Sequence, residues 1–212
     1  MKSNPDIIWL DVAESSNDVA RMAIDSLDNL SVVAVRCQTK GRGQRTNTWE
    51  TAPGQNLTFT IVLKDLEILP SEQIAISQIT ALSVVEFLEM HGIGAKIKLP
   101  NDVYVGTKKI CGILIENSLR GSHITWSIIG IGINVNQTVF PSSLPNPTSI
   151  LLETKVSGHA QEAIAAASLD LDLQLANFHK IYSSYYTKYL SDRNESTLSE
   201  LDQLFKSKLI SL

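Results

Sequence analysis

A single long helical pattern separates two groups of strand-like segments in this 212-residue chain. From Ser71 to Met90 apolar residues recur at a spacing close to 3.6 residues, and Gly92 follows as a stop signal. The segments on either side are short, apolar and bounded by turn-forming residues. Because strands and helices do not alternate, a doubly wound nucleotide-binding fold is disfavoured. The order predicts an α+β fold with a mixed, largely antiparallel sheet and helices grouped on one side.

Six short segments have the composition or alternation of strands. They are residues Ile7 to Leu10, Ser31 to Cys37, Leu57 to Leu63, Ala95 to Lys98, Lys109 to Glu116 and Ile124 to Val135. In the third segment, apolar residues alternate with Thr58, Thr60 and Val62, which predicts one strongly buried face. Serines before Val19 predict a helix after the first strand, and a second apolar stripe predicts a long helix from Gln161 to Leu190.

The expected domain organisation is one compact unit with a short appendage. A chain of this length can bury a core without disulfides or a structural metal. No linker or internal repeat divides it, so residues 1–190 are expected to form one domain. Residues 191–212 are more polar, and they are expected to form a loosely attached tail.

Composition narrows the function classes. The net charge of −4 disfavours broad nucleic-acid binding, which usually needs a basic face. No apolar run approaches the roughly 18 residues of a bilayer span, and the first residues lack the apolar core of a signal peptide. Cys37 and Cys111 are far apart and outside any metal-binding spacing, so neither a disulfide nor a zinc site is favoured. The chain is expected to be soluble and cytoplasmic, without a membrane partner.

The loop from Gln38 to Asn56 is the richest candidate for chemistry. Its glycines permit close backbone approach, and its side chains can donate to anionic oxygens. These residues are Gly41, Gly43, Gly54, Arg42, Gln44 and Arg45. No acidic residue lies between Arg36 and Arg45, so a positive field suited to a small anion is expected. The alternative is a solvated loop, because neither GxGxxG nor a P-loop is present. An exposed Trp49 would be costly there without a role.

Two further polar segments follow strands. Lys98, Asn101 and Asp102 lie just past one strand, and Lys109 begins the next. A capped hairpin turn and a solvated strand end are the alternative interpretations. The segment from Ile128 to Asn136 carries two glycines inside a strand and then two asparagines. Such glycines mark either close approach of a ligand or a bulge with tight packing, so this segment alone names no ligand.

Together these segments resemble the biotin–protein ligases, whose α+β, class II synthetase-like fold is shared with lipoyl ligases. The similarity covers roughly residues 5 to 190, and its specificity comes from the order of all the motifs. The residues that carry it are Ser15-Ser16-Asn17, Gln38-Thr39-Lys40-Gly41-Arg42-Gly43-Gln44-Arg45, Trp49, Pro53-Gly54-Gln55-Asn56-Leu57, Lys98-Leu99-Pro100-Asn101-Asp102, Lys108-Lys109-Ile110-Cys111-Gly112-Ile113-Leu114-Ile115-Glu116 and Gly130-Ile131-Gly132-Ile133-Asn134-Val135-Asn136.

The resemblance implies a site for biotin and ATP. The side chains expected to hydrogen-bond the ureido head group are Ser15, Ser16, Asn17 and Gln38. Gly41 and Gly112 are expected to line the biotin. The residues expected on the nucleotide side are Gln44, Arg45, Trp49, Asn101 and Asn134. The implied catalytic residues are Arg42 and Lys109, which would hold the biotin carboxylate and the α-phosphate, and Asp102, which would carry Mg²⁺ or orient the incoming amine.

The implied activity is ATP-dependent biotinylation of a carrier protein. The biotin carboxylate would attack the α-phosphate, release pyrophosphate and give biotinyl-5′-adenylate. A lysine of the biotin carboxyl carrier domain of a carboxylase would then attack the acyl carbon and expel AMP. Fixed cations and Mg²⁺ would offset the repulsion between the two anions, and closure of the loop would limit hydrolysis. A homodimer is left open.

The chain departs from the family pattern in several places. Leu99 stands where a tryptophan is frequent, which changes packing but removes no donor. Gln44, Thr46 and Asn47 stand where many relatives carry arginine, glycine and arginine, so fewer cations are expected around the adenylate. No helix-turn-helix precedes the first strand, and residues 191–212 are too few for the small β-barrel that commonly follows. A non-regulatory type that does not bind DNA is expected.

Three other interpretations are open at this stage. A lipoyl or octanoyl ligase would share the fold and the lysine target, but polar residues at Ser15 to Asn17 and at Gln38 favour a ureido group over an aliphatic tail. A catalytically weak biotin-binding protein is suggested by the altered loop, whereas Arg42, Asp102 and Lys109 argue against it. In a plain scaffold, the glycine loop would serve only structure.

Overall fold

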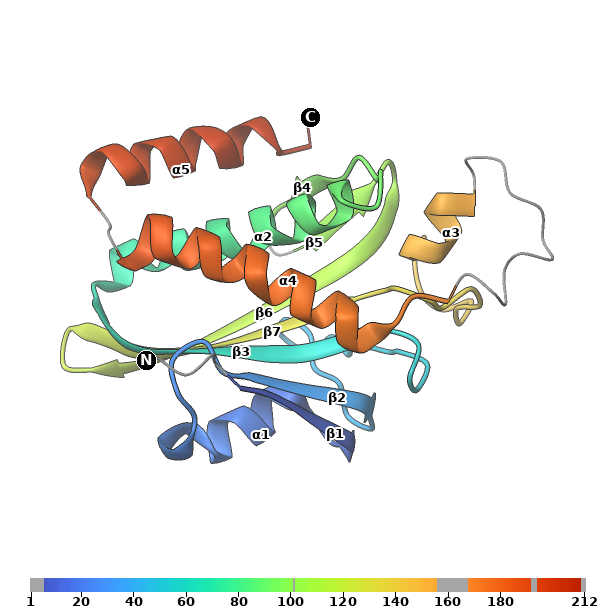
Figure 1. Ribbon diagram of the computed structural model, residues 1–212, viewed down its shortest axis with the longest axis horizontal. Coiled ribbons are helices and arrows are strands. Elements are labelled where there is room, and N and C mark those ends of the chain that lie inside the picture. The colour runs from blue at the N-terminus through green and yellow to red at the C-terminus, as the bar shows by residue number, and fades with distance from the viewer. Residues whose placement is uncertain (1–5, 101, 156–167, 192–193, 211–212) are drawn as a thin grey trace. The chain divides into compact units, whose positions relative to one another are not determined.

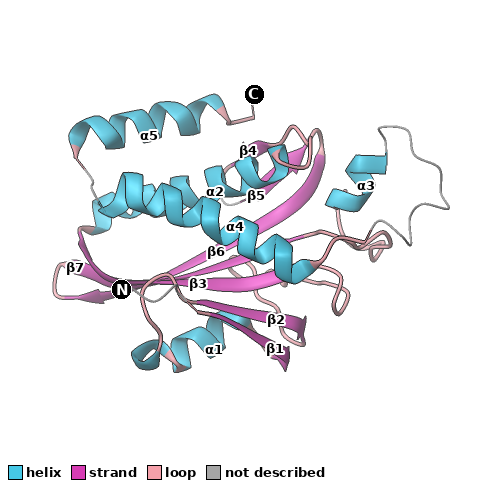
Figure 2. Ribbon diagram, in the orientation of Figure 1, coloured by secondary structure: helices cyan, strands magenta, loops and turns pink. Residues whose placement is uncertain are grey.

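The computed structural model describes residues 6–100, 102–155, 168–191 and 194–210. The chain forms two compact units, and each is assembled from two stretches of sequence. The first unit comprises Met1–Ile74 and Ile113–Gly132, and the second comprises Ala75–Gly112 and Ile133–Leu212. The helices and strands are labelled in Figure 1 and coloured by type in Figure 2.

Strands and helices follow one another in a mixed order. The strands are β1 (Ile7–Ala13), β2 (Val32–Gln38), β3 (Leu57–Ile68), β4 (Lys96–Lys98), β5 (Asp102–Val105), β6 (Lys108–Arg120) and β7 (His123–Ile133). The α-helices are α1 (Ser16–Met22), α2 (Gln73–Glu89), α3 (Ile150–Lys155), α4 (Leu171–Tyr186) and α5 (Glu195–Ser207). Short helical turns are η1 (Ile24–Ser26), η2 (Pro70–Glu72) and the π-helical η5 (Thr187–Ser191).

The strands form one mixed sheet with the order β1-β2-β3-β7-β6-β5-β4. Strands β1 and β2 are parallel, whereas the β2–β3, β4–β5 and β5–β6 pairings are antiparallel. The expected α+β class with a mixed, largely antiparallel sheet is therefore confirmed. The grouping of the helices on one side stays a prediction, because the helices are divided between the two units.

The predicted strands are all present, but one observed strand is absent from the prediction. Residues Asp102–Val105 form β5, which pairs with β4 and β6, although the sequence was interpreted there as turns. The strand is too short to display an alternating pattern, so only its pairing partners define it.

Residues 57–63 of strand β3 are buried on both faces, which corrects the expectation of one buried face. Thr58, Thr60 and Val62 are as buried as the apolar residues between them. Helix α1 packs on β2 and β3 and covers this second face. The threonines are tolerated because their hydroxyls are hydrogen-bonded; Thr58 Oγ1, for example, donates to Val35 O at 2.6 Å.

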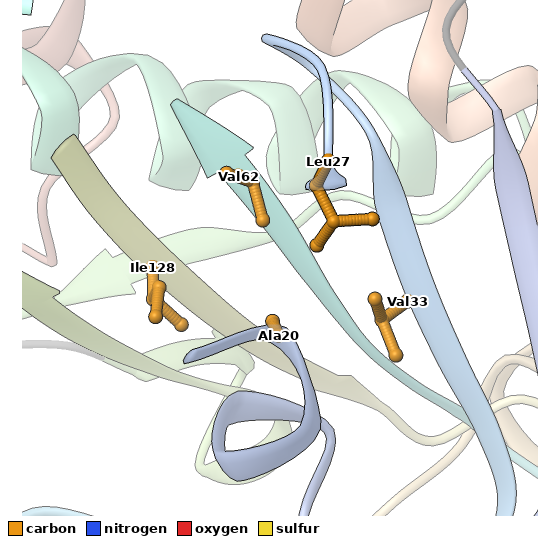
Figure 3. Packing of buried hydrophobic residues seen from close by; sticks show 5 residues of the cluster. All are labelled: Ala20, Leu27, Val33, Val62 and Ile128. Atoms are coloured by element: carbon orange, nitrogen blue, oxygen red, sulfur yellow. The ribbon is translucent and has the colours of Figure 1, made fainter. Parts of the chain in front are cut away.

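The apolar core of the first unit lies between α1 and the strands. Figure 3 shows its buried members, which are Ala20, Leu27, Val33, Val62 and Ile128. Helix α1 contributes one small residue, and β2, β3 and β7 each contribute a β-branched one. Because the polar residues at the start of α1 belong to the same short helix, this core fixes where they lie.

Leu27→Ala is expected to lower the free energy of unfolding by about 2–4 kcal/mol, because it leaves a cavity in this core. Leu27 is only 5% exposed. Val12→Ala on β1, where the side chain is 63% exposed, is the control and should cost less than about 1 kcal/mol. Urea unfolding followed by circular dichroism measures both. Equal losses in the two variants would contradict the assigned core.

The long C-terminal helix begins later than its sequence pattern indicates. Residues 161–167 of the predicted helix lie outside the described residues, and 168–170 are not helical. Helix α4 begins at Leu171, because the Asp170 carboxylate accepts hydrogen bonds from the amides of Asp172 and Leu173. This is an N-cap, which ends the helix on its N-terminal side.

The described part of the segment after residue 190 is packed into the second unit. Helix α5 buries Leu201 and Phe205. The amide of Ile97 on β4 donates to Lys208 O at 2.8 Å, and the amide of Ile210 donates to Ile97 O at 3.0 Å. The expectation of a loose attachment is therefore wrong for these residues. The boundary between a domain 1–190 and a tail 191–212 stays a prediction. None of the described helices has the length and apolarity needed to cross a bilayer.

Candidate functional site

Three neighbouring polar residues at the start of α1 are buried. Ser15, Ser16 and Asn17 are 4%, 4% and 2% exposed. Ser15 is the N-cap residue, yet its side chain makes no capping hydrogen bond. The cap is supplied from β2 instead, because Gln38 Oε1 accepts from the Ser16 amide at 2.7 Å. Two of the segments predicted to bind one head group are thus in direct contact.

The hydrogen bonds around Asn17 fix the orientation of its amide. Asn17 Nδ2 donates to Glu116 Oε2 at 2.7 Å and lies 3.4 Å from Leu114 O. On the other side, Thr60 Oγ1 lies 2.6 Å from Asn17 Oδ1 and 2.8 Å from Ser16 Oγ. Because the carbonyl of Asn17 has no proton, Thr60 donates to Asn17 and accepts from Ser16. Asn17 Oδ1 keeps a second lone pair for an N–H donor of a ligand.

Glycine is required at position 130 by the position of Asn17. A Cβ built on Gly130 would lie 2.4 Å from Asn17 Oδ1 and 3.0 Å from Asn17 Cγ. Of the two readings of the glycines in this strand, close approach applies here, and the approaching group is a side chain of the predicted site. Strand β7 therefore forms one wall of the polar cluster.

Arg42 lies in a network of alternating charges. Its Nη1 and Nη2 bind the Glu116 carboxylate at 3.2 and 2.9 Å, and Nη2 also binds Asp18 at 2.8 Å. Arg21 binds the same Glu116 carboxylate and lies 3.5 Å from Asp18. Two arginines and two carboxylates give this network no net charge. Burial alone would raise the pKa of Glu116, but hydrogen bonds from Asn17 and Arg42 and the arginine charges lower it below its ordinary value.

The lowered pKa of Glu116 predicts an acid-sensitive contribution to stability. A carboxyl group whose folded-state pKa is depressed stabilises the fold fully above its unfolded pKa, and this stabilisation is lost as pH falls through the folded pKa. Glu116→Gln should therefore destabilise the protein at pH 7. When the pH falls below 4.5, the ordinary pKa of a glutamate carboxyl, the variant should lose less stability than wild type. Urea unfolding at several pH values measures this. Glu50→Gln, in the exposed part of the loop, is the control and should follow the wild-type curve.

The predicted glycine-rich loop between β2 and β3 is confirmed as a loop, and residues 41–49 within it form a small hairpin. The amide of Gly43 donates to Asn47 O at 2.8 Å, and the amide of Trp49 donates to Gly41 O at 2.9 Å. A Cβ on Gly41 would lie 2.3 Å from Trp49 O, so this position requires glycine. The turn places Gln44 and Arg45 at its tip, with Arg45 at φ 58°.

The Trp49 side chain is only partly exposed. Its indole lies against β7, where a Cβ built on Gly132 would meet Trp49 Cε2 at 2.3 Å. The second glycine of this strand is thus also explained by a close contact. The hairpin carries the predicted nucleotide-side tryptophan onto the same strand that contacts Asn17.

The positive field expected between residues 36 and 45 is largely neutralised. Lys40 Nζ binds Glu14 at 2.7 Å, and Arg42 is held by two carboxylates. The Arg36 guanidinium lies 4.2 Å from the centre of the Trp9 ring. The acidic partners come from other parts of the chain. The absence of acidic residues between Arg36 and Arg45 therefore did not show how much positive charge remains there.

The second unit holds another group of predicted residues. Lys109 Nζ lies 2.7 Å from Asp102 Oδ1, with the two side chains 31% and 20% exposed. The pair joins β6 to β5, where Asp102 is also the register partner of Gly112. The alternative interpretation of Lys109 as a solvated strand end is therefore wrong. Burial raises the pKa of the neighbouring Cys111 thiol, which keeps it protonated.

Asn134 anchors the backbone beside Lys109. Its Nδ2 donates to Thr148 O at 2.9 Å, and its amide donates to Ile110 O at 3.0 Å. Thr148 in turn donates from its amide to Lys109 O at 2.9 Å. Asn134 is 4% exposed, and its Oδ1 has no hydrogen-bond partner among the described residues. Buried acceptors without a partner are rare, so this atom is a candidate for contact with a donor from outside the chain.

The predicted residues thus form two groups. The first unit brings together Ser15, Ser16, Asn17, Gln38, Gly41, Arg42 and Trp49. The second brings together Asp102, Lys109, Gly112 and Asn134. Asn101 lies outside the described residues. No role was predicted for Thr60, Asp18 or Glu116, although Glu116 closes the motif that begins at Lys108 and so could have been singled out.

Comparisons with known proteins give the same family throughout. The family model described as "Biotin/lipoate A/B protein ligase family" matches residues 9–134. The bifunctional ligase/repressor BirA of Bacillus subtilis is 32% identical over 184 residues, with 85% of this chain and 55% of that protein covered. The biotin–[acetyl-CoA-carboxylase] ligase of Paracoccus denitrificans is 30% identical over 158 residues, with 69% and 62% covered.

A solved structure resembles the whole described fold. The biotin protein ligase from Aquifex aeolicus in complex with biotin and ATP superimposes with a TM-score of 0.76 at 27% identity, and the match covers 98% of this chain and 79% of that one. The chain spans about half (55%) of the length of the Bacillus subtilis relative.

Proposed function

Since the chain belongs to the biotin/lipoate A/B protein ligase family, we propose that it activates biotin with ATP and transfers the biotinyl group to a lysine of a biotin carboxyl carrier domain. The observation that carries this proposal is the buried polar cluster of the first unit, formed by Ser15, Ser16, Asn17 and Gln38. The solved structures that resemble this chain include a biotin protein ligase in complex with biotin and ATP.

The cluster fits a ureido group better than an aliphatic tail. A ureido group has two N–H donors and one carbonyl acceptor. Asn17 Oδ1 offers a free lone pair, and the buried Ser15 hydroxyl is not used in capping α1. An octanoyl or lipoyl tail offers no hydrogen-bond partner to these groups, and a buried polar group left unsatisfied costs about 1–3 kcal/mol. The head group of biotin is therefore the better match.

In the first half-reaction, an oxygen of the biotin carboxylate attacks the α-phosphorus of ATP, and the bond to pyrophosphate breaks. Both reactants are anions, so cations must lie where negative charge accumulates. Arg42 is proposed to hold the carboxylate, and Lys109 the α-phosphate. The roles proposed on the nucleotide side belong to Gln44, Arg45, Trp49, Asn101 and Asn134, and Gly41 and Gly112 permit close approach of the biotin.

Magnesium is proposed as the ion that accompanies ATP, with Asp102 as its protein ligand. The described residues contain no group of three His, Cys, Asp or Glu side chains that could enclose a metal. A single carboxylate nevertheless fits this ion, because Mg²⁺ is often held by one or two carboxylates, water and the phosphates of its nucleotide. Bound there, it would withdraw charge from the phosphates. Lys109 already balances the Asp102 charge at 2.7 Å.

In the second half-reaction, the neutral amine of the carrier lysine attacks the acyl carbon of biotinyl-5′-adenylate. The bond between this carbon and the phosphate oxygen breaks, AMP leaves, and the amine loses its proton. Asp102 is the proposed group that orients the amine. The hairpin of residues 41–49 is proposed to cover the adenylate and so exclude water before the carrier arrives.

The test is ATP–pyrophosphate exchange by the purified chain with Mg²⁺ and biotin, lipoate, octanoate or no acid. Exchange with biotin alone is the expected result, and addition of a carrier domain should then give biotinylated protein. Exchange with lipoate or octanoate instead would replace biotin by that acid. Biotin binding without any exchange would show a binding protein and not a ligase.

A further inference from the structure

Glu116 contacts both a proposed ureido-binding residue and the proposed carboxylate-binding residue. Its Oε2 accepts from Asn17 Nδ2 at 2.7 Å and from Arg42 Nη2 at 2.9 Å. Its Oε1 accepts from Arg42 Nη1 at 3.2 Å and from Arg21. The Glu116 side chain is 24% exposed, so these bonds lie partly out of water, where charge-assisted bonds are strong.

The contact with Asn17 decides which way its amide faces. With the Nδ2 held by Glu116, the Oδ1 must face Thr60 Oγ1, 2.6 Å away, and presents its remaining lone pair. A flipped amide would turn its oxygen toward the carboxylate, which is repulsive. Glu116 thus selects the amide orientation that can accept from an N–H donor.

The contact with Arg42 limits the freedom of a long side chain. A guanidinium held at two nitrogens by one carboxylate has lost most of its rotamer freedom before a ligand arrives. Asp18 also binds Arg42, at 2.8 Å, but no hydrogen bond between Asp18 and Asn17 is described. Asp18 and Glu116 carry the same charge, but Glu116 also accepts a hydrogen bond from Asn17.

We propose that Glu116 is a positioning residue that fixes Asn17 and Arg42 together, so that the two ends of a bound biotin are recognised by one preassembled unit. This inference rests on the proposed function. It predicts that loss of Glu116 weakens recognition of the ureido end as well as the carboxylate end. A carboxylate that acted only by its charge near Arg42 would affect the carboxylate end alone.

The experiment compares wild type, Glu116→Gln and Asp18→Asn by calorimetric titration with biotin and with biotinol, in which the carboxylate is replaced by an uncharged alcohol. Both variants lose one negative charge from the same network. Glu116→Gln is expected to raise the Kd of biotin about tenfold or more and that of biotinol about fivefold, in the range for the loss of a hydrogen bond. Asp18→Asn should leave the Kd of biotinol within about twofold.

The outcomes separate the inference from the proposed function. Wild type that binds neither biotin nor biotinol overturns both. Wild type that binds biotin, with Glu116→Gln unchanged toward biotinol, overturns the inference and leaves the function standing. Thermal unfolding checks that each variant is folded. If Glu116→Gln is not, Glu116→Asp keeps the charge and shortens the reach by one methylene, and its biotinol Kd is then the deciding value.

Discussion

Lys109→Ala is expected to lower the rate of biotin-dependent ATP–pyrophosphate exchange by about 10²–10³-fold or more, the usual cost of one group aimed at developing charge. Lys109 forms an ion pair with Asp102 at 2.7 Å, so its loss also leaves that carboxylate without this compensating charge. Both effects oppose the approach of a triphosphate. Binding of biotin alone should change far less, since the buried polar cluster of the first unit does not contain Lys109.

The matched control for this prediction is the adjacent lysine. Lys108 lies on the same strand and binds Glu153 at 2.6 Å, with 44% of its side chain exposed. Lys108→Ala removes the same charge and is expected to keep the exchange rate within about fivefold, a change of less than 1 kcal/mol. Equal exchange in Lys109→Ala and wild type would remove Lys109 from the proposed catalytic residues.

Gly130→Ala is expected to weaken biotin binding by about 100-fold and to lower the free energy of unfolding by about 1–3 kcal/mol, the usual cost of overpacking. The added methyl group would lie 2.4 Å from Asn17 Oδ1, which is closer than real contacts allow. Asn17 must therefore move, and the acceptor proposed for the ureido group moves with it. Calorimetric titration with biotin and urea unfolding measure the two effects.

Two companion variants make the Gly130 result specific. Gly94→Ala adds a methyl group where no atom lies within 4 Å, so it should change stability by less than about 0.5 kcal/mol and leave biotin binding intact. The double variant Gly130→Ala/Asn17→Ala removes the Asn17 amide with which the added methyl group would clash. It should regain stability relative to Gly130→Ala without regaining biotin binding. Recovery of binding would show that Asn17 is not the acceptor.

Local patterns predicted the sheet where they extend over several residues. The β-branched run that became β2 and the alternation that became β3 carry enough apolar positions to be recognised alone. Strand β5 has only four residues, and it exists through pairing with β4 and β6. The prediction of one continuous helix up to residue 190 missed the N-cap at Asp170, after which α4 begins at Leu171.

The candidate site was predictable as a set of residues but not as a set of contacts. Motif order selected Ser16, Asn17 and Gln38, and the structure places them together. The partners of Arg42 could not be predicted, because Glu116 is 74 positions away and Asp18 is 24. The charge pattern of a sequence shows only which charges are neighbours along the chain, whereas ion pairs also form between residues that are distant in sequence. The same limit made the loop look more positive than it is.

The pairing of Arg42 and Arg21 with Asp18 and Glu116 has a consequence for the rate at which a small anion arrives. A network without net charge produces a field that falls off steeply, so it does not draw anions from solution over a Debye length. Encounter with this part of the molecule is then governed by ordinary diffusion, with little dependence on ionic strength. Under the proposed function, discrimination among carboxylic acids would come after contact, in how long each acid stays bound.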